Sequence, residues 1–161
     1  PADAEALGRA IEARLGLTPP RGARRVAQGG HELIWSGPDQ WLLRAASREG
    51  FAASLDALAP FAAVSDQSDA RAGLRVTGPR ARDVLAKGVM LDLDPRVFAV
   101  GDVAMTVVSH VNIHLWRTED EGADAAFEIL VPRSFAGSVW SWFAASAAAF
   151  GCRVEARGAV L

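Results

Sequence analysis

The sequence predicts an α+β fold with mostly antiparallel sheets and helices packed on them. Expected strands and helices are mixed along the chain, and several strands follow one another with only a short segment between them. Such neighbours pair as antiparallel hairpins. The 161 residues, half of them hydrophobic, suffice for one domain with a sizeable core and are few for two. We therefore expect an N-terminal helix and mobile connector over residues 1–30 and a single α+β domain over residues 31–161.

The N-terminal arm is predicted from one apolar stripe. Three apolar residues recur at a spacing of four, which is typical of an amphipathic helix over residues 4–15: Leu7, Ile11 and Leu15. Residues 18–30 are rich in Pro, Gly and Arg, which indicates a mobile connector. The helix either docks on another surface or caps the domain.

Eight strands are expected in the domain. The first two form a hairpin that turns at Gly37, Pro38 and Asp39, whereas no obvious tight turn separates the fifth strand from the sixth. The order suggests two duplicated, ferredoxin-like halves, one before and one after the helix that follows Gly78. The strands are predicted at residues 32–35, 41–45, 62–65, 73–77, 103–110, 111–118, 126–131 and 153–156.

Three helices are expected between these strands. The first covers residues 51–58. In the second, Gly78 is a candidate N-cap, Pro79 a candidate first helical residue and Gly88 the C-terminal stop. Ser134 is expected to cap the third helix, over residues 135–150.

Composition excludes several classes of function. The net charge of about −2 gives no sign of a nucleic-acid surface, and the basic cluster at Arg21, Arg24 and Arg25 fits a solvated linker. No apolar run reaches the roughly 20 residues needed to cross a bilayer. A single cysteine, Cys152, allows no internal disulfide, so we expect a cytoplasmic location.

Motifs for cofactors and nucleophiles are lacking in the sequence. No GxGxxG follows an expected strand and no GxxxxGK[ST] occurs, so a dinucleotide or a nucleoside triphosphate would find no usual phosphate cradle. Cys152 follows a helix end, where no helix dipole lowers its pKa, and no GxSxG marks a serine. We expect no catalytic residue, cofactor site or metal site in this chain alone.

Two histidines, His110 and His114, have the spacing of a helical metal pair. The residues around them are β-branched and aromatic, which favours a strand. At ~3.3 Å per residue the rings would lie ~13 Å apart on one face, too far for a shared zinc ion. We expect these histidines to lie at an interface or in a hydrogen-bonded core.

Two other features are candidates for a groove or a partner contact. The densest polar cluster between expected strands is Asp66, Gln67, Ser68, Asp69 and Arg71. It either lines a groove or contacts a partner, or it is an Asx-type turn bonded to its own backbone. Trp140 lies roughly 110° from the apolar stripe of the last helix, which makes it a candidate interface anchor. Its alternative is a wide buried helix face.

Several segments, in order, carry a resemblance to a known family. Residues 64–88 (VSDQSDARAGLRVTGPRARDVLAKG) are followed by LDLDPRVF at 91–98 and by FEILVPRSFAGSVWSWF from Phe127, and they are preceded by GPD-WLL from Gly37. Together the segments resemble the gamma subunits of heterotetrameric sarcosine oxidase over residues 31–151. The resemblance implies the folate-binding fold of glycine-cleavage aminomethyltransferases.

The resemblance implies a non-catalytic subunit of a complex that oxidises the N-methyl group of sarcosine. Glycine and hydrogen peroxide are the products, and the one-carbon unit passes to tetrahydrofolate. The implied partners are an alpha subunit with NAD and a folate site, a beta subunit with flavins and a delta subunit with zinc. An isolated chain with exposed apolar surface would be prone to self-association.

Two alternatives remain open from the sequence. The chain could be a stand-alone folate-binding module or small aminomethyltransferase-like protein, in which Asp66 would bind the amino group of a pterin. The complex could instead act on a different N-methyl amine.

Overall fold

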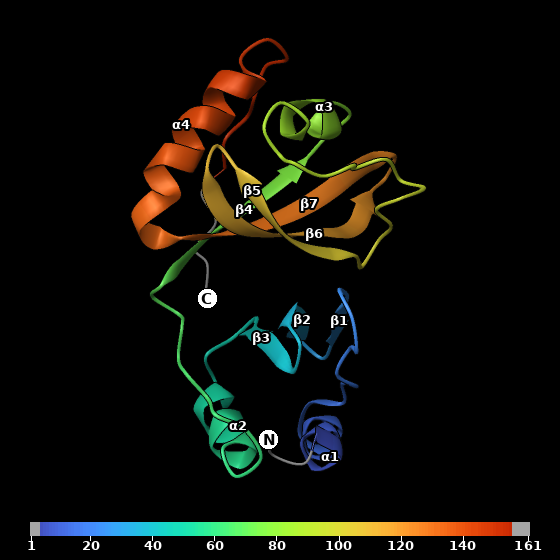
Figure 1. The fold of residues 1–161 in the computed structure, drawn as a ribbon, viewed down its shortest axis with the longest axis vertical. Helices are drawn as coiled ribbons and strands as arrows, with labels where there is room; N and C mark the ends of the chain where they lie inside the picture. Colours follow the sequence, from blue (N-terminus) through green and yellow to red (C-terminus); the bar gives the residue numbers. More distant parts are fainter. Residues whose placement is uncertain (1–3, 156–161) are drawn as a thin grey trace. The chain divides into compact units, whose positions relative to one another are not determined.

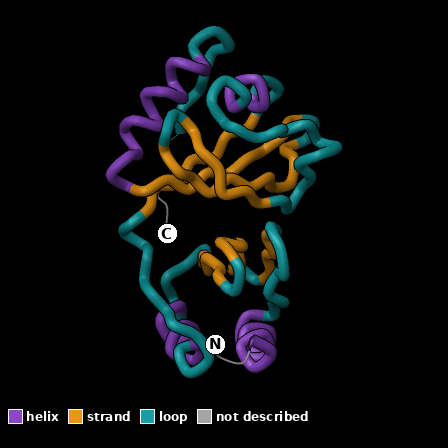
Figure 2. Tube along the Cα trace, viewed as in Figure 1, coloured by secondary structure: helices purple, strands orange, loops and turns teal. Residues whose placement is uncertain are grey.

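The computed structural model describes residues 4–155, and its contacts divide the chain into two compact units. Unit 1 ends at Ser68 and unit 2 begins at Asp69. Both units combine helices with antiparallel sheets, which confirms the predicted α+β class (Figures 1 and 2). Within the described part of the chain, no helix is both long and apolar enough to cross a membrane.

Unit 1 is a three-stranded antiparallel meander with a helix at each end. In chain order its elements are α1 (Ala4–Leu15), β1 (Arg25–Gln28), β2 (His31–Gly37), β3 (Gln40–Ala45) and α2 (Phe51–Leu58). The two helices contact each other, and their apolar stripes meet one face of the sheet. The buried core comprises Ile11, Leu15, Leu17, Leu33 and Leu58.

The predicted mobile connector is wrong over its last part. Residues 25–28 form β1, in which Val26 pairs with Leu33 of β2. Upstream, the Nε1 atom of Trp41 donates a hydrogen bond of 2.9 Å to the carbonyl oxygen of Pro20. The contacts therefore join this segment to the following hairpin, and the chain divides after Ser68, whereas the sequence predicted a boundary at residue 30.

Unit 2 contains a four-stranded antiparallel sheet in the order β4-β7-β6-β5. Residues of α3 and α4 pack with those of one sheet face in a single apolar core, which includes Leu85, Leu115, Phe127 and Val139 (Figure 1). The elements are β4 (Arg71–Thr77), α3 (Ala81–Leu85), β5 (Val103–Val108), β6 (Val111–Glu121), β7 (Asp124–Pro132), the 3₁₀ helix η1 (Arg133–Phe135) and α4 (Ala136–Ala147).

The predicted division into halves at the Pro79 helix is wrong. β4 precedes that helix but pairs with β7, so it belongs to the second sheet. Residues 62–65 are not a strand, nor are residues 153–155, and Ala156 lies outside the described residues. The repetition has another form, since the order helix, three-stranded meander, helix occurs in both units.

A two-residue turn joins β5 to β6, where the sequence showed no turn signal. Ser109 and His110 both have positive φ, at 46° and 69°, and Val108 pairs with Val111 on either side of them. Two central residues with positive φ are characteristic of a type I′ hairpin turn. Turns of this type favour Asn and Gly, so the residues Ser109 and His110 did not predict a turn.

The helix termini differ from those predicted. α3 has only five residues and begins after Pro79, and neither it nor α4 has a side-chain cap. The role of Ser134 as an N-cap is therefore wrong, because it lies inside η1. Gly78 has φ of 125°, so it provides the bend out of β4 and not a cap.

Candidate functional site

The two histidines lie in different environments. His114 is in the middle of β6 and is only 6% exposed, whereas His110 is exposed in the turn that precedes this strand. They do not share a strand face, because positive φ at His110 breaks the alternation of side chains. Among the described residues, no group of three or more His, Cys, Asp or Glu side chains is arranged to hold a metal ion.

His114 is bonded to another predicted site residue, Arg71 of β4. The Nη1 atom of Arg71 lies 3.3 Å from Nδ1 of His114. A guanidinium group can only donate, so Nδ1 must accept and the imidazole is neutral, with its proton on Nε2. Burial lowers the pKa of His114 to about 4, and the positive charge of Arg71 adds to this effect. This pair suits an internal polar contact better than a general acid at neutral pH.

The Arg71–His114 pair lies on the sheet face opposite to the core of unit 2. Alternation along β6 puts His114 and Trp116 on this second face, while Leu115 points into the core. His114 pairs with Leu130 of β7, which in turn pairs with Gly73 of β4. The second face therefore has a buried centre, in which Trp116 and Leu130 are 0% and 5% exposed.

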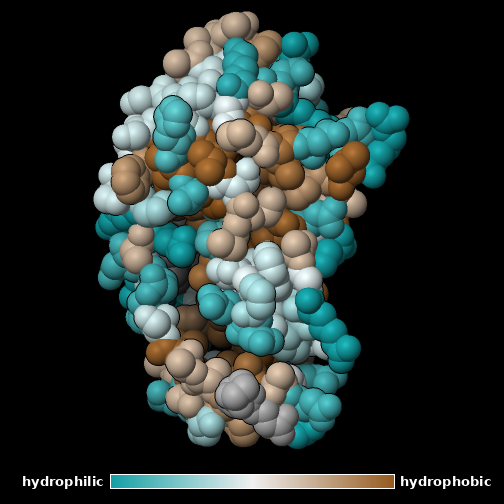
Figure 3. Space-filling view, viewed as in Figure 1, coloured by the Kyte–Doolittle hydropathy of each residue, from teal (hydrophilic) through white to brown (hydrophobic). Residues whose placement is uncertain are grey.

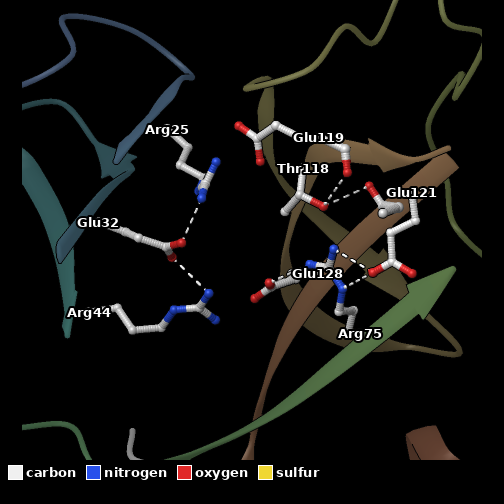
Figure 4. Close-up of polar contacts among 9 residues, drawn as sticks. Arg25, Glu32, Arg44, Arg75, Thr118, Glu119, Glu121 and Glu128 are labelled. Atoms are coloured by element: carbon white, nitrogen blue, oxygen red, sulfur yellow. Dashed lines mark hydrogen bonds and ion pairs between the residues drawn. The ribbon is translucent and has the colours of Figure 1, made fainter. Parts of the chain in front are cut away.

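An ion-pair cluster centred on Arg75 lies on the same sheet face. The guanidinium group donates from Nε to Glu121 at 3.0 Å and from Nη1 to Glu128 at 3.0 Å (Figure 4). Glu128 is directly opposite Arg75 in the sheet, and Glu121 is at the end of β6. The cluster draws the side chain of an edge-strand arginine inward across the sheet.

The polar cluster that begins at Asp66 forms an Asx turn. Oδ1 of Asp66 accepts a hydrogen bond of 2.8 Å from the backbone N–H of Ser68, and Gln67 donates to Ser65. Hydrogen bonds from the side chain and from the backbone of Ser68 lower the pKa of the exposed Asp66 carboxyl. An exposed carboxylate held by its own backbone does not have the setting of a buried acid that would bind a pterin.

Trp140 lies off the core face, as the helical arithmetic predicts. It is 37% exposed, and its ring stacks on Phe143 at 6.0 Å between centroids. Phe135, the last residue of η1, is 50% exposed. Figure 3 shows hydrophobic surface over unit 2 among hydrophilic regions. Other large exposed apolar residues of unit 2 are Met90, Val97, Val100, Met105 and Val154.

Unit 1 contains an ion-pair cluster that is not among the predicted site residues. Glu32 of β2 contacts Arg25 of β1 at 2.6 Å and Arg44 of β3 at 2.8 Å (Figure 4). All three side chains are at most 24% exposed. Arg25 is thus a strand residue and not part of a solvated linker. The usable signal was the pairing of neighbouring strands, because Glu32 and Arg44 are cross-strand neighbours.

Comparison with known proteins places these features in a family. Residues 1–149 match the model of the SoxG family, described as the sarcosine oxidase gamma subunit family. The chain belongs to the sarcosine oxidase gamma subunit family. Its sequence is 34% identical over 116 residues to the sarcosine oxidase subunit gamma of an Arthrobacter species, covering 70% of this chain. It is 33% identical over 140 residues to that of Corynebacterium sp. strain U-96, covering 83% of this chain.

The family fold extends over nearly the whole chain. A chain in the heterotetrameric sarcosine oxidase from Corynebacterium sp. U-96, solved in complex with pyrrole 2-carboxylate, matches with a TM-score of 0.79 and 29% identity. The match covers 93% of this chain and 77% of that chain. The chain spans only part of the length of these relatives. The match covers 57% of the Arthrobacter subunit and 65% of the strain U-96 subunit.

Proposed function

We propose that this chain is the gamma subunit of a heterotetrameric sarcosine-oxidase-like complex, in which it has a structural and non-catalytic role. One observation carries the proposal. The family match over residues 1–149 coincides with a fold match, at a TM-score of 0.79, to a chain of a heterotetrameric sarcosine oxidase. The distribution of side chains supports the structural role.

Three polar residues that were predicted from the sequence to line a groove or contact a partner make contacts inside the chain. Arg71 and His114 bond to each other, and Asp66 bonds to the backbone of Ser68. Reacting groups need a substrate within hydrogen-bond reach and a pKa suited to the working pH. A neutral imidazole with a pKa near 4 and an exposed carboxylate in a turn do not meet both needs.

The chemistry is proposed to reside in partner subunits. An alpha subunit with NAD and a folate site, a beta subunit with flavins and a delta subunit with zinc would oxidise sarcosine to glycine and hydrogen peroxide. The one-carbon unit would pass to tetrahydrofolate. We propose a cytoplasmic location, which fits the exposed, unpaired thiol of Cys152.

Capture of the complex tests the assembly. The tagged chain is purified from its native host, and the eluate is examined for flavin absorbance, subunit stoichiometry and hydrogen peroxide formed from sarcosine. Equimolar flavin-containing subunits and sarcosine-dependent peroxide are expected. A colourless chain that purifies alone would contradict the assignment.

The non-catalytic role needs a separate measurement on the assembled complex. The double change Arg71→Gln and His114→Gln removes the contact between this guanidinium group and the buried imidazole. Peroxide formation per flavin should stay within about twofold of the unmodified complex, because neither residue is proposed to touch substrate. A loss of a hundredfold with assembly intact would overturn this role.

A further inference from the structure

The outer edge of β4 exposes a row of backbone groups. Arg133 donates its backbone N–H to the carbonyl of Ala70 at 2.9 Å, and this bond sets the phase of the β4–β7 ladder. In an antiparallel pair, every second residue bonds to the neighbouring strand. The backbone groups of Ala72, Leu74 and Val76 therefore point toward β7. Those of Arg71, Gly73, Arg75 and Thr77 point away from the sheet.

This edge is accessible in the structure. β4 is the terminal strand of the order β4-β7-β6-β5, and Gly73, Arg75 and Thr77 are all exposed. Exposure of Gly73 is exposure of backbone, because glycine has no side chain. Within the described part of the chain, the outward backbone groups of these three residues have no backbone partner.

The edge lacks two of the usual protections against strand addition, because β4 contains no proline and no bulge. Natural sheets guard open edges with charged side chains, prolines or bulges. The charged residue at the centre of this edge, Arg75, is instead drawn across the sheet by Glu121 and Glu128 (Figure 4). The register of β4 with β7 runs without a shift from Arg71 to Thr77. β4 is thus a regular edge strand of seven residues.

Gly73 is not required by the chain itself. Its φ is not positive, and a Cβ atom built there would meet only Leu130, at an ordinary contact distance of 3.7 Å. Glycine inside a strand costs roughly 0.5–1 kcal/mol relative to alanine. A glycine inside a strand often marks a bulge, a tight bend or the close approach of a ligand or another backbone. The unshifted register of β4 with β7 leaves no bulge at Gly73.

We propose that the outer edge of β4, from Arg71 to Thr77, accepts an extended strand from another subunit of the complex. Only an extended polypeptide presents alternating N–H and C=O groups at the spacing of this edge. The inference rests on the proposed function, because the strand that binds at this edge belongs to another subunit of the proposed complex. It adds the segment of this chain that the partner contacts.

Hydrogen exchange at single amides tests the proposal in the isolated chain and in the purified complex. In the isolated chain, the amides of Gly73, Arg75 and Thr77 should exchange at least tenfold faster than those of Leu74 and Val76. In the complex, the three fast amides should slow by at least tenfold. Fast exchange in both samples, or slow exchange in both, would overturn the proposal. Protection that rises with the concentration of the isolated chain would replace the partner subunit by a second copy.

A proline substitution gives an independent test. Gly73→Pro removes an outward N–H and no ladder hydrogen bond, so the chain should fold, while Gly73→Ala keeps the N–H as the matched control. Capture of flavin-containing subunits should fall at least tenfold for Gly73→Pro and little for Gly73→Ala. Should Gly73→Pro lower the melting temperature strongly, Thr77→Pro at the end of the edge replaces it.

The outcomes separate the two proposals. Normal capture by folded proline variants would overturn the edge contact and leave the proposed function standing. Failure of the unmodified chain to assemble would overturn both.

Discussion

The charge state of His114 follows from its burial and its neighbour. The imidazole is 6% exposed and accepts a hydrogen bond from Arg71, which is possible only in the neutral form. Its pKa falls from 6.5 to about 4 in the folded chain. Between these two values the unfolded chain binds the proton and the folded chain does not. Acidification through this range therefore destabilises the fold. The part of the folding stability that depends on the neutral imidazole is fully present only above pH 6.5.

Replacement of His114 tests this pH dependence. His114→Gln retains an acceptor for Arg71 but cannot titrate. Urea unfolding at pH 7 and pH 5 should show that the unmodified chain loses about 2 kcal/mol more than the variant, at 1.36 kcal/mol per pH unit. His110→Asn is the matched control, because Asn tolerates the positive φ of that exposed turn. Equal losses in all three chains would contradict the assignment.

Gly88 allows helix α4 to pack close to the end of α3. A Cβ atom at Gly88 would lie 2.6 Å from Cζ2 of Trp142, which is well inside contact distance. Nearby, Lys87 donates to the carbonyl of Ser146, and both Arg80 and Lys87 lie 4.6 Å from the ring centroid of Phe150. Gly88 was predicted to end a helix through its conformational freedom. Its φ is not positive, so close packing is the better explanation.

Substitution of Gly88 should therefore destabilise unit 2. Gly88→Ala forces the indole ring of Trp142 to move, and we expect a loss of about 1–3 kcal/mol, as for overpacked cores. Gly137→Ala is the matched control, because nothing lies within 4 Å of the added atom in the first turn of α4. That change should stabilise the chain by up to about 1 kcal/mol. Thermal unfolding of both variants checks the difference, and equal melting temperatures would contradict the packing argument.

The segment between α3 and β5 is held by two arginines. Nε of Arg82 donates to the carbonyl of Leu93 at 3.1 Å, and Nη1 of Arg117 donates to that of Phe98 at 3.2 Å. Arg117 is 6% exposed and also binds Asp120 through Nη2. Charged donors on backbone carbonyls order a long connection that has no ladder of its own. The segment presents the exposed side chains of Met90 and Val97 on an ordered backbone.

At the scale of the whole molecule, exposed aromatic surface is expected to serve assembly. Trp140→Ala removes a ring that is 37% exposed and stacked on Phe143. Capture of flavin-containing subunits should weaken at least tenfold, while the chain loses less than about 1 kcal/mol of stability, because anchors at interfaces dominate binding. The control is Trp142→Ala, which removes a partly buried ring packed against the core and should lower the melting temperature markedly. A large stability loss for Trp140→Ala with normal capture would show that this ring belongs to the core.

Local patterns in the sequence determined most of the elements and the family. The four-residue stripe gave α1, the Gly-Pro-Asp turn gave the β2–β3 hairpin, and residues 51–58 gave α2, because each signal involves only neighbours along the chain. Among the site candidates, the position of Trp140 off the core face followed from the helical period alone. The order of motifs over residues 31–151 pointed to the gamma subunit family.

Only the tertiary structure decided contacts between residues far apart in the chain. β4 pairs with β7, although the two strands are separated by more than 40 residues, and this pairing brings Arg75 to Glu128 and moves β4 into the second sheet. His114 contacts Arg71 for the same reason. Gly88, which follows α3, packs against Trp142 of α4. Strand register and helix packing depend on which surfaces meet, and a pattern of neighbouring residues carries no information about that choice.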